Sequence, residues 1–239
     1  MNIVEATHVS KEYYLGKQKV TALTDVSITI TKGEFLAIAG SSGSGKTTLL
    51  NLIGCIDAPT SGTITIDSED TTNRSHDDLS SLRAKHIGFI FQTFNLLPVL
   101  TAWENVEFPL LNRPDISPDF RDEQVSHYLN LVGLAKLTGH RPDQLSGGQR
   151  QRVAIARALA GRPTIILADE PTANLDRETG LNILALMKHI NRREQATFIF
   201  STHDPKVIAL ANRTVRIVDG RIVDPALELN EAAGMANDA

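Results

Sequence analysis

The sequence predicts an α/β fold built on a parallel sheet, with an antiparallel β subdomain at the N-terminus and an inserted helical subdomain. Short apolar runs such as Phe35 to Ala39 are typical of parallel strands that are buried on both faces. Apolar and polar residues alternate before residue 31, and helix signals appear between about 93 and 146. Because ligands of open α/β sheets bind beyond the carboxyl ends of the strands, we expect the functional residues there.

Length and composition favour some classes of protein over others. A chain of 239 residues can bury a substantial core, either as one large domain or as a domain with a subdomain. The net charge of −4 gives no indication of a dedicated nucleic-acid or anionic-membrane surface. The single cysteine, Cys55, is expected to be a small buried thiol on the first helix. We find no secretion signal and no apolar run of about eighteen residues, so we expect a cytosolic chain that does not span a membrane.

A glycine-rich segment between an apolar strand and a helix indicates a nucleotide site. It fits G-x-x-x-x-G-K-[ST], the phosphate loop, in which backbone N–H groups and the helix dipole face phosphate oxygens. The segment consists of Gly40, Ser41, Ser42, Gly43, Ser44, Gly45, Lys46, Thr47 and Thr48. Lys46 is expected to reach the β- and γ-phosphates of a nucleoside triphosphate, and the Thr47 hydroxyl to bind Mg²⁺. A loop that only turns the chain is the less favoured interpretation. Apolar residues from Leu49 to Ile56 continue at helical spacing.

Residues 2 to 30 are predicted to form antiparallel strands, with a turn at Lys32 and Gly33 before the first buried strand. Tyr13 and Tyr14 lie between these strands in this prediction. An aromatic side chain shortly before a phosphate loop can stack on adenine, but ordinary packing is the more common role of such a residue. The residues alone leave both interpretations open.

The segment after the first helix is predicted to end at another candidate site residue. We expect a strand at 63–67, a polar loop at 68–76, a short helix from about Asp77 to Lys85, and a strand at 87–91. Gln92 ends this last strand. Because Gln92 and Gly40 would both lie at carboxyl ends of strands, the glutamine is a candidate ligand contact.

The segment from about 93 to 146 is predicted to be the helical subdomain. Thr101 and Glu104 fit a capping box, and a proline-containing break at 114–118 precedes further helical patterns. An apolar cluster comprises Phe94, Leu96, Leu97, Leu100 and Trp103. This cluster is either local core or a groove that binds a helix of a partner protein.

Two further segments carry candidate site residues. The helix that begins near Ser146, Gly147, Gly148 and Gln149 offers a second N-terminus to an anion. The strand that follows it ends in Asp169 and Glu170. In phosphate-loop enzymes a strand-end aspartate holds Mg²⁺, and Glu170 is placed to polarise an attacking water. A solvated strand end is the less favoured interpretation.

The remaining pattern predicts a helix from Glu178 to about Asn191 and a strand from Ala196 to Ser201. His203 follows this strand, and although a lone histidine is usually structural, a position near the γ-phosphate favours catalysis. A hairpin is predicted around Asp219 and Gly220. We assign residues 1–224 to one domain and expect 225–239 to be a mobile tail.

Together these segments resemble the ATP-binding subunit of ABC transporters, over essentially the whole chain up to about residue 224. The family's motifs correspond to the phosphate loop Gly40–Thr48, the Q-loop Gln92, the signature Leu145–Gln149, the Walker B strand Ile165–Asp169, the D-loop Ala173–Asp176 and the switch histidine His203. Tyr13 resembles the adenine-stacking aromatic better than Tyr14 does. Ala173 stands where the lipoprotein-releasing and macrolide-exporter members of the family usually have Gly or Ser. This difference concerns contacts between two copies of the chain and leaves the hydrolytic residues intact.

The resemblance implies roles and partners. Glu170 would be the general base, His203 would steady the γ-phosphate, and Gln92 would couple Mg²⁺ to the helical subdomain. Two copies would pack head to tail, so that Ser146, Gly147 and Gly148 of one copy close over ATP bound to the other. The other implied partner is an integral-membrane permease, which places the protein on the cytoplasmic face of the membrane. No nucleic-acid partner is expected.

A finer resemblance is to the lipoprotein-releasing (LolD), macrolide-exporter (MacB) and cell-division (FtsE) types, carried by residues 51–57, 87–92, 95–98 and 101–106. It implies an ATPase that drives a permease working on extracytoplasmic cargo. A soluble, nucleic-acid-associated ATPase is the main alternative, but only about fifty residues separate Gln92 from Ser146, too few for a long coiled coil. A signalling ATPase of the cell-division type, which moves no substrate, also stays open.

Overall fold

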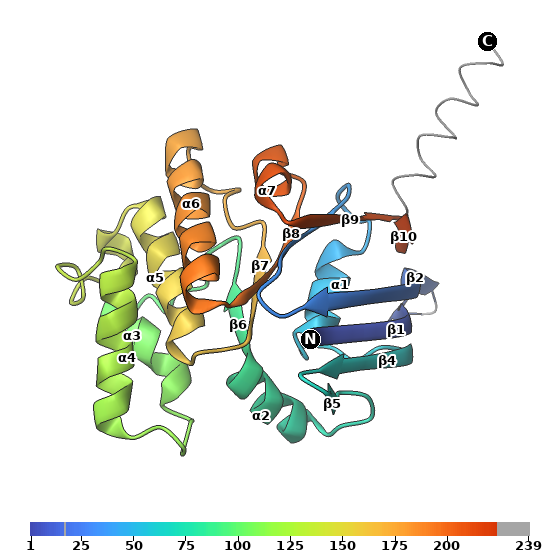
Figure 1. Cartoon of the computed structure of the whole chain (residues 1–239), viewed down its shortest axis with the longest axis horizontal. Helices are drawn as coiled ribbons and strands as arrows, with labels where there is room; N and C mark the ends of the chain where they lie inside the picture. The colour runs from blue at the N-terminus through green and yellow to red at the C-terminus, as the bar shows by residue number, and fades with distance from the viewer. Residues whose placement is uncertain (17, 224–239) are drawn as a thin grey trace, which may run out of the picture.

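The computed structural model describes residues 1–16 and 18–223, so the tail predicted at 225–239 lies outside the described residues (Figure 1). The strands are β1 (Asn2–Leu15), β2 (Gln18–Thr31), β3 (Phe35–Ala39), β4 (Ser61–Ile66), β5 (Glu69–Asp70), β6 (Ile87–Ile90), β7 (Ile165–Asp169), β8 (Thr197–Thr202), β9 (Arg213–Val218) and β10 (Arg221–Val223). The helices are α1 (Lys46–Ile53), α2 (His76–His86), α3 (Ala102–Glu107), α4 (Pro118–Leu131), α5 (Gly147–Ala160), α6 (Arg177–Glu194) and α7 (Pro205–Leu210). Two 3₁₀ turns are η1 (Phe108–Leu110) and η2 (Pro142–Gln144).

A six-stranded sheet in the order β10-β9-β3-β8-β7-β6 forms the centre of the fold. Its strands are parallel except β10, which pairs antiparallel with β9. The apolar sequences of β3 and of β7 up to Ala168 suit this position, because helices or the second sheet cover both faces of these strands. β8 lies between these two strands and is parallel to both. The three segments that follow β3, β8 and β7 therefore lie side by side at the carboxyl end of the sheet. The prediction of an α/β fold is therefore confirmed.

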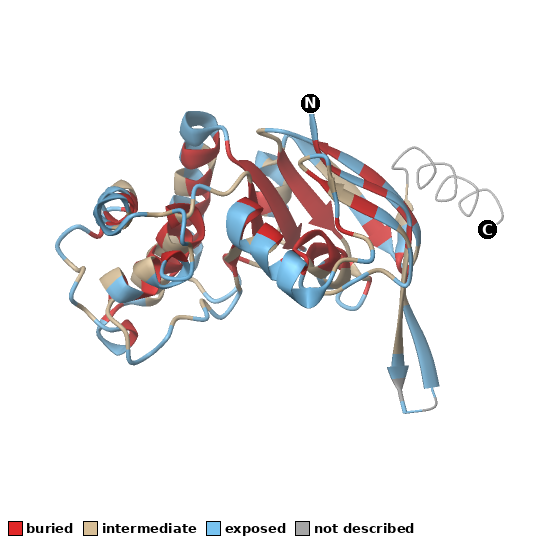
Figure 2. Cartoon of the chain, turned by 90° about the horizontal axis from the view of Figure 1, so that it is seen from below, coloured by how far each residue is buried: buried red, intermediate tan, exposed pale blue. Residues whose placement is uncertain are grey.

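A four-stranded antiparallel sheet, β2-β1-β4-β5, covers α1, which contacts both sheets. Buried and exposed residues alternate along the last part of β2, from Val26 to Thr31, as the sequence predicted (Figure 2). The prediction that Tyr13 and Tyr14 lie between strands is wrong. They pair with Val20 and Lys19, because the β1–β2 ladder continues to Leu15 and the chain turns only at Gly16.

The first helix is shorter than the apolar spacing predicted. α1 ends at Ile53, and Ile56 is 48% exposed outside it. Cys55 also lies beyond the helix end, in a left-handed backbone conformation with φ of 53°. The expectation of a buried thiol is nevertheless confirmed, and burial raises the pKa of Cys55 to about 11.

The helical region packs α3, α4 and α5 around one apolar cluster that also receives Trp103 and Leu96 at its margin. The capping box at α3 is present: the Thr101 hydroxyl accepts from the Glu104 N–H at 3.2 Å, and the Glu104 carboxylate accepts from the Thr101 N–H at 2.7 Å. Leu97 is 37% exposed, so the apolar cluster predicted from sequence is only partly core.

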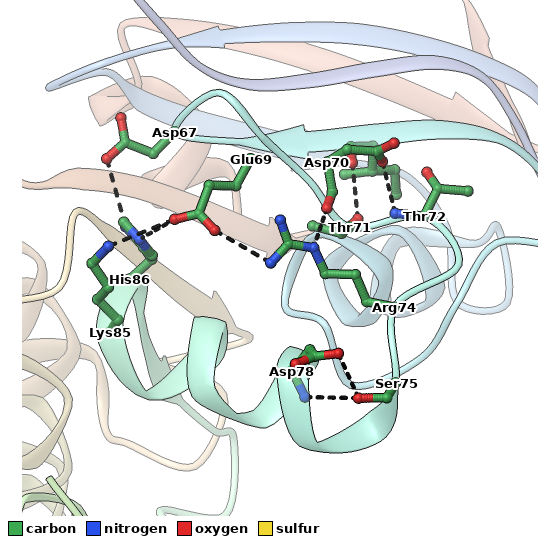
Figure 3. Close-up of polar contacts among 11 residues, drawn as sticks. Asp67, Glu69, Asp70, Thr71, Thr72, Arg74, Ser75, Asp78, Lys85 and His86 are labelled. Carbon is green, nitrogen blue, oxygen red and sulfur yellow. Dashed lines mark hydrogen bonds and ion pairs between the residues drawn. The ribbon is translucent and has the colours of Figure 1, made fainter. Parts of the chain in front are cut away.

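The polar stretch predicted as a loop at 68–76 contains the short strand β5, which supports α2. Glu69 of β5 receives ion pairs from Arg74 and Lys85, and His86 lies between Asp67 and Glu69 (Figure 3). Burial lowers the pKa of His86, Lys85 adds to this effect, and the two carboxylates oppose it. This charge cluster fixes α2 against the edge of the antiparallel sheet.

Among residues 1–16 and 18–223, we find no helix that is both long and apolar enough to span a bilayer.

Candidate nucleotide site

The loop between β3 and α1 is built for close approach to a ligand. A Cβ at Gly40 would lie 2.3 Å from the Ile217 carbonyl oxygen, so the backbone fits only without a side chain. Gly45 has a φ of 108°, a conformation that L-residues rarely adopt, and no side chain caps α1 behind it. The N-terminal N–H groups of α1 are therefore left for an anion.

Lys46 is 7% exposed, and its ammonium donates to the carbonyl oxygens of Gly40 and Ser41 at 2.9 and 2.8 Å. The side chain thus curls back over the loop, across the space that the backbone N–H groups surround. The Ser44 hydroxyl beside it is buried with no hydrogen-bond partner among the described residues. A cation and an unpaired hydroxyl in one glycine-lined loop fit a phosphate group.

Thr47 and Asp169 come together across the sheet from segments 122 residues apart. The Thr47 hydroxyl lies 3.3 Å from each carboxylate oxygen of Asp169. A hydroxyl and a carboxylate are oxygen ligands of the kind that Mg²⁺ takes beside phosphates, so the donor set fits this ion. The structure brings these two predicted metal ligands together.

Glu170 and His203 form a second pair of polar groups at the carboxyl end of the sheet, after Thr47 and Asp169. The Glu170 carboxylate lies 2.5 Å from His203 Nδ1, and it accepts from the His203 N–H and the Thr202 hydroxyl at 3.1 Å each. The Glu170 backbone is left-handed, with φ of 44°, and its N–H donates to the Ser201 carbonyl oxygen. Sequence reasoning missed Thr202, although its position directly before His203 at a strand end was the available signal.

Tyr13 of β1 makes a polar contact with the segment that follows α1. Its hydroxyl donates to Asp57 at 2.9 Å, and the Lys11 ammonium lies 4.9 Å from its ring centroid. Burial and the Asp57 carboxylate raise the pKa of the phenol. Tyr14 is 69% exposed on the opposite side of the strand. The two candidates thus lie on opposite faces of β1, and polar contacts with Asp57 and Lys11 hold Tyr13 in place.

The second glycine-containing helix start lies next to the loop after β7. Ser146 caps α5 in a complete capping box with Gln149, and a Cβ at Gly147 would lie 3.5 Å from Leu175. A Cβ at Gly148 would meet Thr179 at 2.5 Å. Within the described chain, the atoms nearest to these two glycines belong to this loop and to α6, not to the phosphate loop.

Gln92 is exposed just beyond β6, and its carbonyl oxygen accepts a hydrogen bond from Asn174 at 2.9 Å. Beside this loop, a cavity of about 390 Å³ lies between α2, β6, η1 and α5. Its lining is largely apolar and includes Phe89, Phe91 and Phe108, together with Arg157. A half-buried groove therefore adjoins the loop that carries Gln92.

The fold and the strand-end residues define a phosphate-loop ATPase. The profile of the family described as "ABC transporter" matches residues 23–173, more than half of the chain. This protein belongs to the ABC transporter family, as an ATP-binding and ATP-hydrolysing subunit.

Individual relatives agree with this assignment. The chain is 45% identical to the lipoprotein-releasing system ATP-binding protein LolD of Bordetella avium over 92% of this chain and 95% of that protein. It is 46% identical to the macrolide export ATP-binding/permease protein MacB of Bradyrhizobium diazoefficiens over 92% of this chain but only 34% of that protein. A dimeric, post-hydrolysis structure of the ATP-binding cassette MJ0796 of Methanocaldococcus jannaschii with ADP and phosphate matches with a TM-score of 0.84 and 45% identity, covering 92% of this chain and 97% of that one.

Proposed function

We propose that this protein is the ATPase of a transporter of the lipoprotein-release or macrolide-efflux type, and that it works as a head-to-tail homodimer on a membrane permease. The observation that carries the proposal is the convergence of Lys46, Thr47, Asp169, Glu170 and His203 at the ends of three adjacent strands. This is the set of groups that phosphoryl transfer to water requires: a phosphate cradle, metal ligands and a base.

Nucleotide binding rests on the phosphate loop and on Tyr13. The N–H groups from Gly40 to Thr48 and the Lys46 ammonium would bind the phosphates, once this ammonium exchanges its two carbonyl partners for phosphate oxygens. Tyr13 would offer its ring to adenine while Asp57 fixes its hydroxyl. Lys11 now lies over this ring, so adenine binding requires either the other ring face or displacement of Lys11.

Thr47, Asp169 and Gln92 would hold Mg²⁺. When bound, Mg²⁺ supplies positive charge that offsets the charge on the transferring phosphate oxygens. Asp169 is oriented toward the Thr47 hydroxyl, and Gln92 would complete the set from the adjacent loop after β6.

Glu170 would accept a proton from the water that attacks the γ-phosphate. The Thr202 hydroxyl and the His203 N–H fix its carboxylate, so the base is oriented before the nucleotide arrives. The His203 ring, 72% exposed at its side chain, would leave the carboxylate and donate to a γ-phosphate oxygen.

A second copy of the chain would complete the site. The signature residues Ser146, Gly147, Gly148 and Gln149 pack beside the loop after β7 in their own chain, and this leaves them available to a nucleotide bound by another copy. The dimeric assembly of the relative MJ0796 with ADP and phosphate supports this arrangement. Hydrolysis would remove the contact between copies, because the γ-phosphate is the group that both bind.

The groove beside Gln92 would receive a helical segment of the permease. Phe108 is 49% exposed and Leu111 is 52% exposed near this groove, and Asn95 of the Gln92 loop lines it. An apolar groove of this kind fits the apolar face of a helix. The permease in the name of MacB supports a membrane partner, and with it a position at the cytoplasmic face of the membrane.

Replacing Glu170 by Gln tests the proposal, because an amide cannot accept the proton. Turnover of ATP should fall by roughly 100-fold or more, while ATP binding persists and an ATP-dependent dimer accumulates. Steady-state phosphate release and size-exclusion chromatography with and without ATP measure these effects. Glu123→Gln, the same change at an exposed position on α4, is the matched control and should behave as wild type.

Near wild-type turnover in Glu170→Gln would overturn the role of this residue as the base. Capture of the tagged variant from solubilised membranes in ATP then identifies the partner. A permease with few membrane-spanning helices and a large extracytoplasmic domain supports the proposed type, whereas recovery of nucleic acid or of the dimer alone contradicts it.

A further inference from the structure

Side chains from other segments donate hydrogen bonds to the carbonyl oxygens of the loop that carries Gln92. Arg157 of α5 donates to the carbonyl oxygens of Asn95 and Phe94 at 2.6 and 2.8 Å, and Asn174 donates to that of Gln92 at 2.9 Å. Phe94 and Asn95 both have left-handed backbones, with φ of 63° and 48°. Because non-glycine residues adopt this conformation only at a cost, the external donors are what keep the loop in this shape.

Asn174 belongs to the loop that starts at Glu170. Two hydrogen-bonded turns cover the segment from Glu170 to Leu175. The Ala173 N–H donates to the Glu170 carbonyl oxygen at 3.1 Å, and the Leu175 N–H donates to the Thr172 carbonyl oxygen at 3.1 Å. Gln151 of α5, fully buried, donates to the carbonyl oxygen of Pro171 at 2.7 Å. The short segment between Glu170 and Asn174 is therefore stiff, and the position of one end determines the position of the other.

The Asn174 side chain is the direct link between the two loops. α5 contacts both of them, through Arg157 on one side and Gln151 on the other. Among the residues that the structure describes, Asn174 is the one side chain that belongs to one loop and donates a hydrogen bond to the other. The bond spans 82 residues of sequence and lies at the surface. An exposed hydrogen bond of this kind is weak enough to break and re-form as the loops move.

We propose that Asn174 is a positioning residue that fixes the spacing between the Gln92 loop and Glu170. When the bond is intact, displacement of the Gln92 loop, for instance by a partner in the adjoining groove, shifts the segment that aims the Glu170 carboxylate. When it is broken, Gln92 and Glu170 move independently. This inference rests on the roles proposed above for Gln92 as a metal ligand and Glu170 as the base.

The first test uses the nucleotide-free protein and needs no activity. Asn174→Ala removes the donor, and Asn174→Asp places a carboxylate against the Gln92 carbonyl oxygen. Hydrogen exchange of the Phe94 and Asn95 amides, which donate within the loop at 3.2 and 2.7 Å, should accelerate about fivefold in both variants. The matched control is Asn130→Ala, because Asn130 is also exposed and donates to a main-chain oxygen, at 2.8 Å within α4.

Unchanged exchange in both Asn174 variants overturns the proposal. It is also overturned if exchange rises throughout the chain together with a fall in Tm, since Asn174 would then be a general structural residue.

The second test follows ATP turnover against Mg²⁺ concentration. Loss of the link should raise the Mg²⁺ concentration for half-maximal turnover about fivefold and leave ATP affinity in EDTA unchanged. Equal Mg²⁺ dependence in wild type and Asn174→Ala contradicts the proposal. If Glu170→Gln retains full turnover while the exchange result holds, the proposed base is wrong but the link between the loops stands.

Discussion

The two helices with glycines at their starts, α1 and α5, differ in how the backbone N–H groups of their N-termini are satisfied. α1 follows Gly45 without any side-chain cap, whereas Ser146 caps α5 and accepts from the Gln149 N–H at 3.3 Å. Gln149 returns the contact by accepting from the Ser146 N–H at 2.8 Å. Two helix starts that look alike in sequence therefore differ in function: α1 needs an anion, and α5 is complete without one.

The side chains around the starts of α1 and α5 differ as well. Lys46 at the start of α1 is buried and adds a cation from the same chain, but Ser146 at the start of α5 is exposed. A site with its own cation can bind a nucleotide in a single copy. A capped, exposed helix start binds only when a second molecule presents the ligand, which agrees with the dimer proposed above.

The largest effect that separates the two helices is expected from Lys46→Ala. Loss of a charged donor to phosphate should weaken ATP binding on the order of 10- to 100-fold in a single copy. Titration of the nucleotide-free protein with ATP in EDTA measures this. Lys136→Ala, an exposed lysine in the helical region, should bind ATP as wild type does. An unchanged affinity in Lys46→Ala would contradict the role of α1 as the primary anion site.

A smaller effect of a different kind is expected from Ser146→Ala. The lost cap costs about 1 kcal/mol, which lowers Tm by roughly 2–4 °C in a chain of this size. ATP affinity of the single copy should not change, but the ATP-dependent dimer of the Glu170→Gln background should be lost. Ser117, which caps α4 by accepting from the Phe120 N–H, offers the matched control Ser117→Ala. If both serine variants dimerise equally, Ser146 acts as a cap only.

Local patterns predicted those parts of the fold that depend on neighbouring residues. The apolar runs of β3 and β7 and the strand-end positions of Glu170 and His203 follow from spacing alone, and the structure agrees. Side-chain contacts between distant segments could not be predicted in this way where no motif links the two residues. The Asn174–Gln92 bond joins positions 82 residues apart, and nothing in either segment indicates the other.

The strand pairing of Tyr13 shows that local sequence patterns can also fail to predict contacts between segments close in the chain. The sequence prediction placed Tyr13 between two strands, but the register with β2 depends on how far the facing strand extends. The depth of the groove beside Gln92 is likewise set by α2 and η1, two elements that only the folded chain brings together.

The smallest effect concerns the two capping boxes, which differ in charge. Gln149 closes the box of α5, and Glu104 closes that of α3. Hydrogen bonds from the Thr101 N–H and hydroxyl hold the pKa of Glu104 below its usual value. A lowered folded-state pKa contributes stability above the unfolded-state pKa, and this stability is lost as pH falls through the folded-state value. The neutral Gln149 amide has no such dependence.

We therefore expect Glu104→Gln to reduce the loss of Tm between about pH 5 and pH 3, where carboxyl groups of this type protonate. Gln149→Glu, the reciprocal change, should make the stability contributed by the α5 cap fall at acidic pH. It also places a negative charge at a helix start that is proposed to bind ATP. Thermal unfolding across this pH range checks the first effect, and ATP-dependent dimer formation at neutral pH checks the second. If Gln149→Glu dimerises as well as Glu104→Gln does, the start of α5 does not meet the phosphates, and the two helix starts differ only in how they are capped.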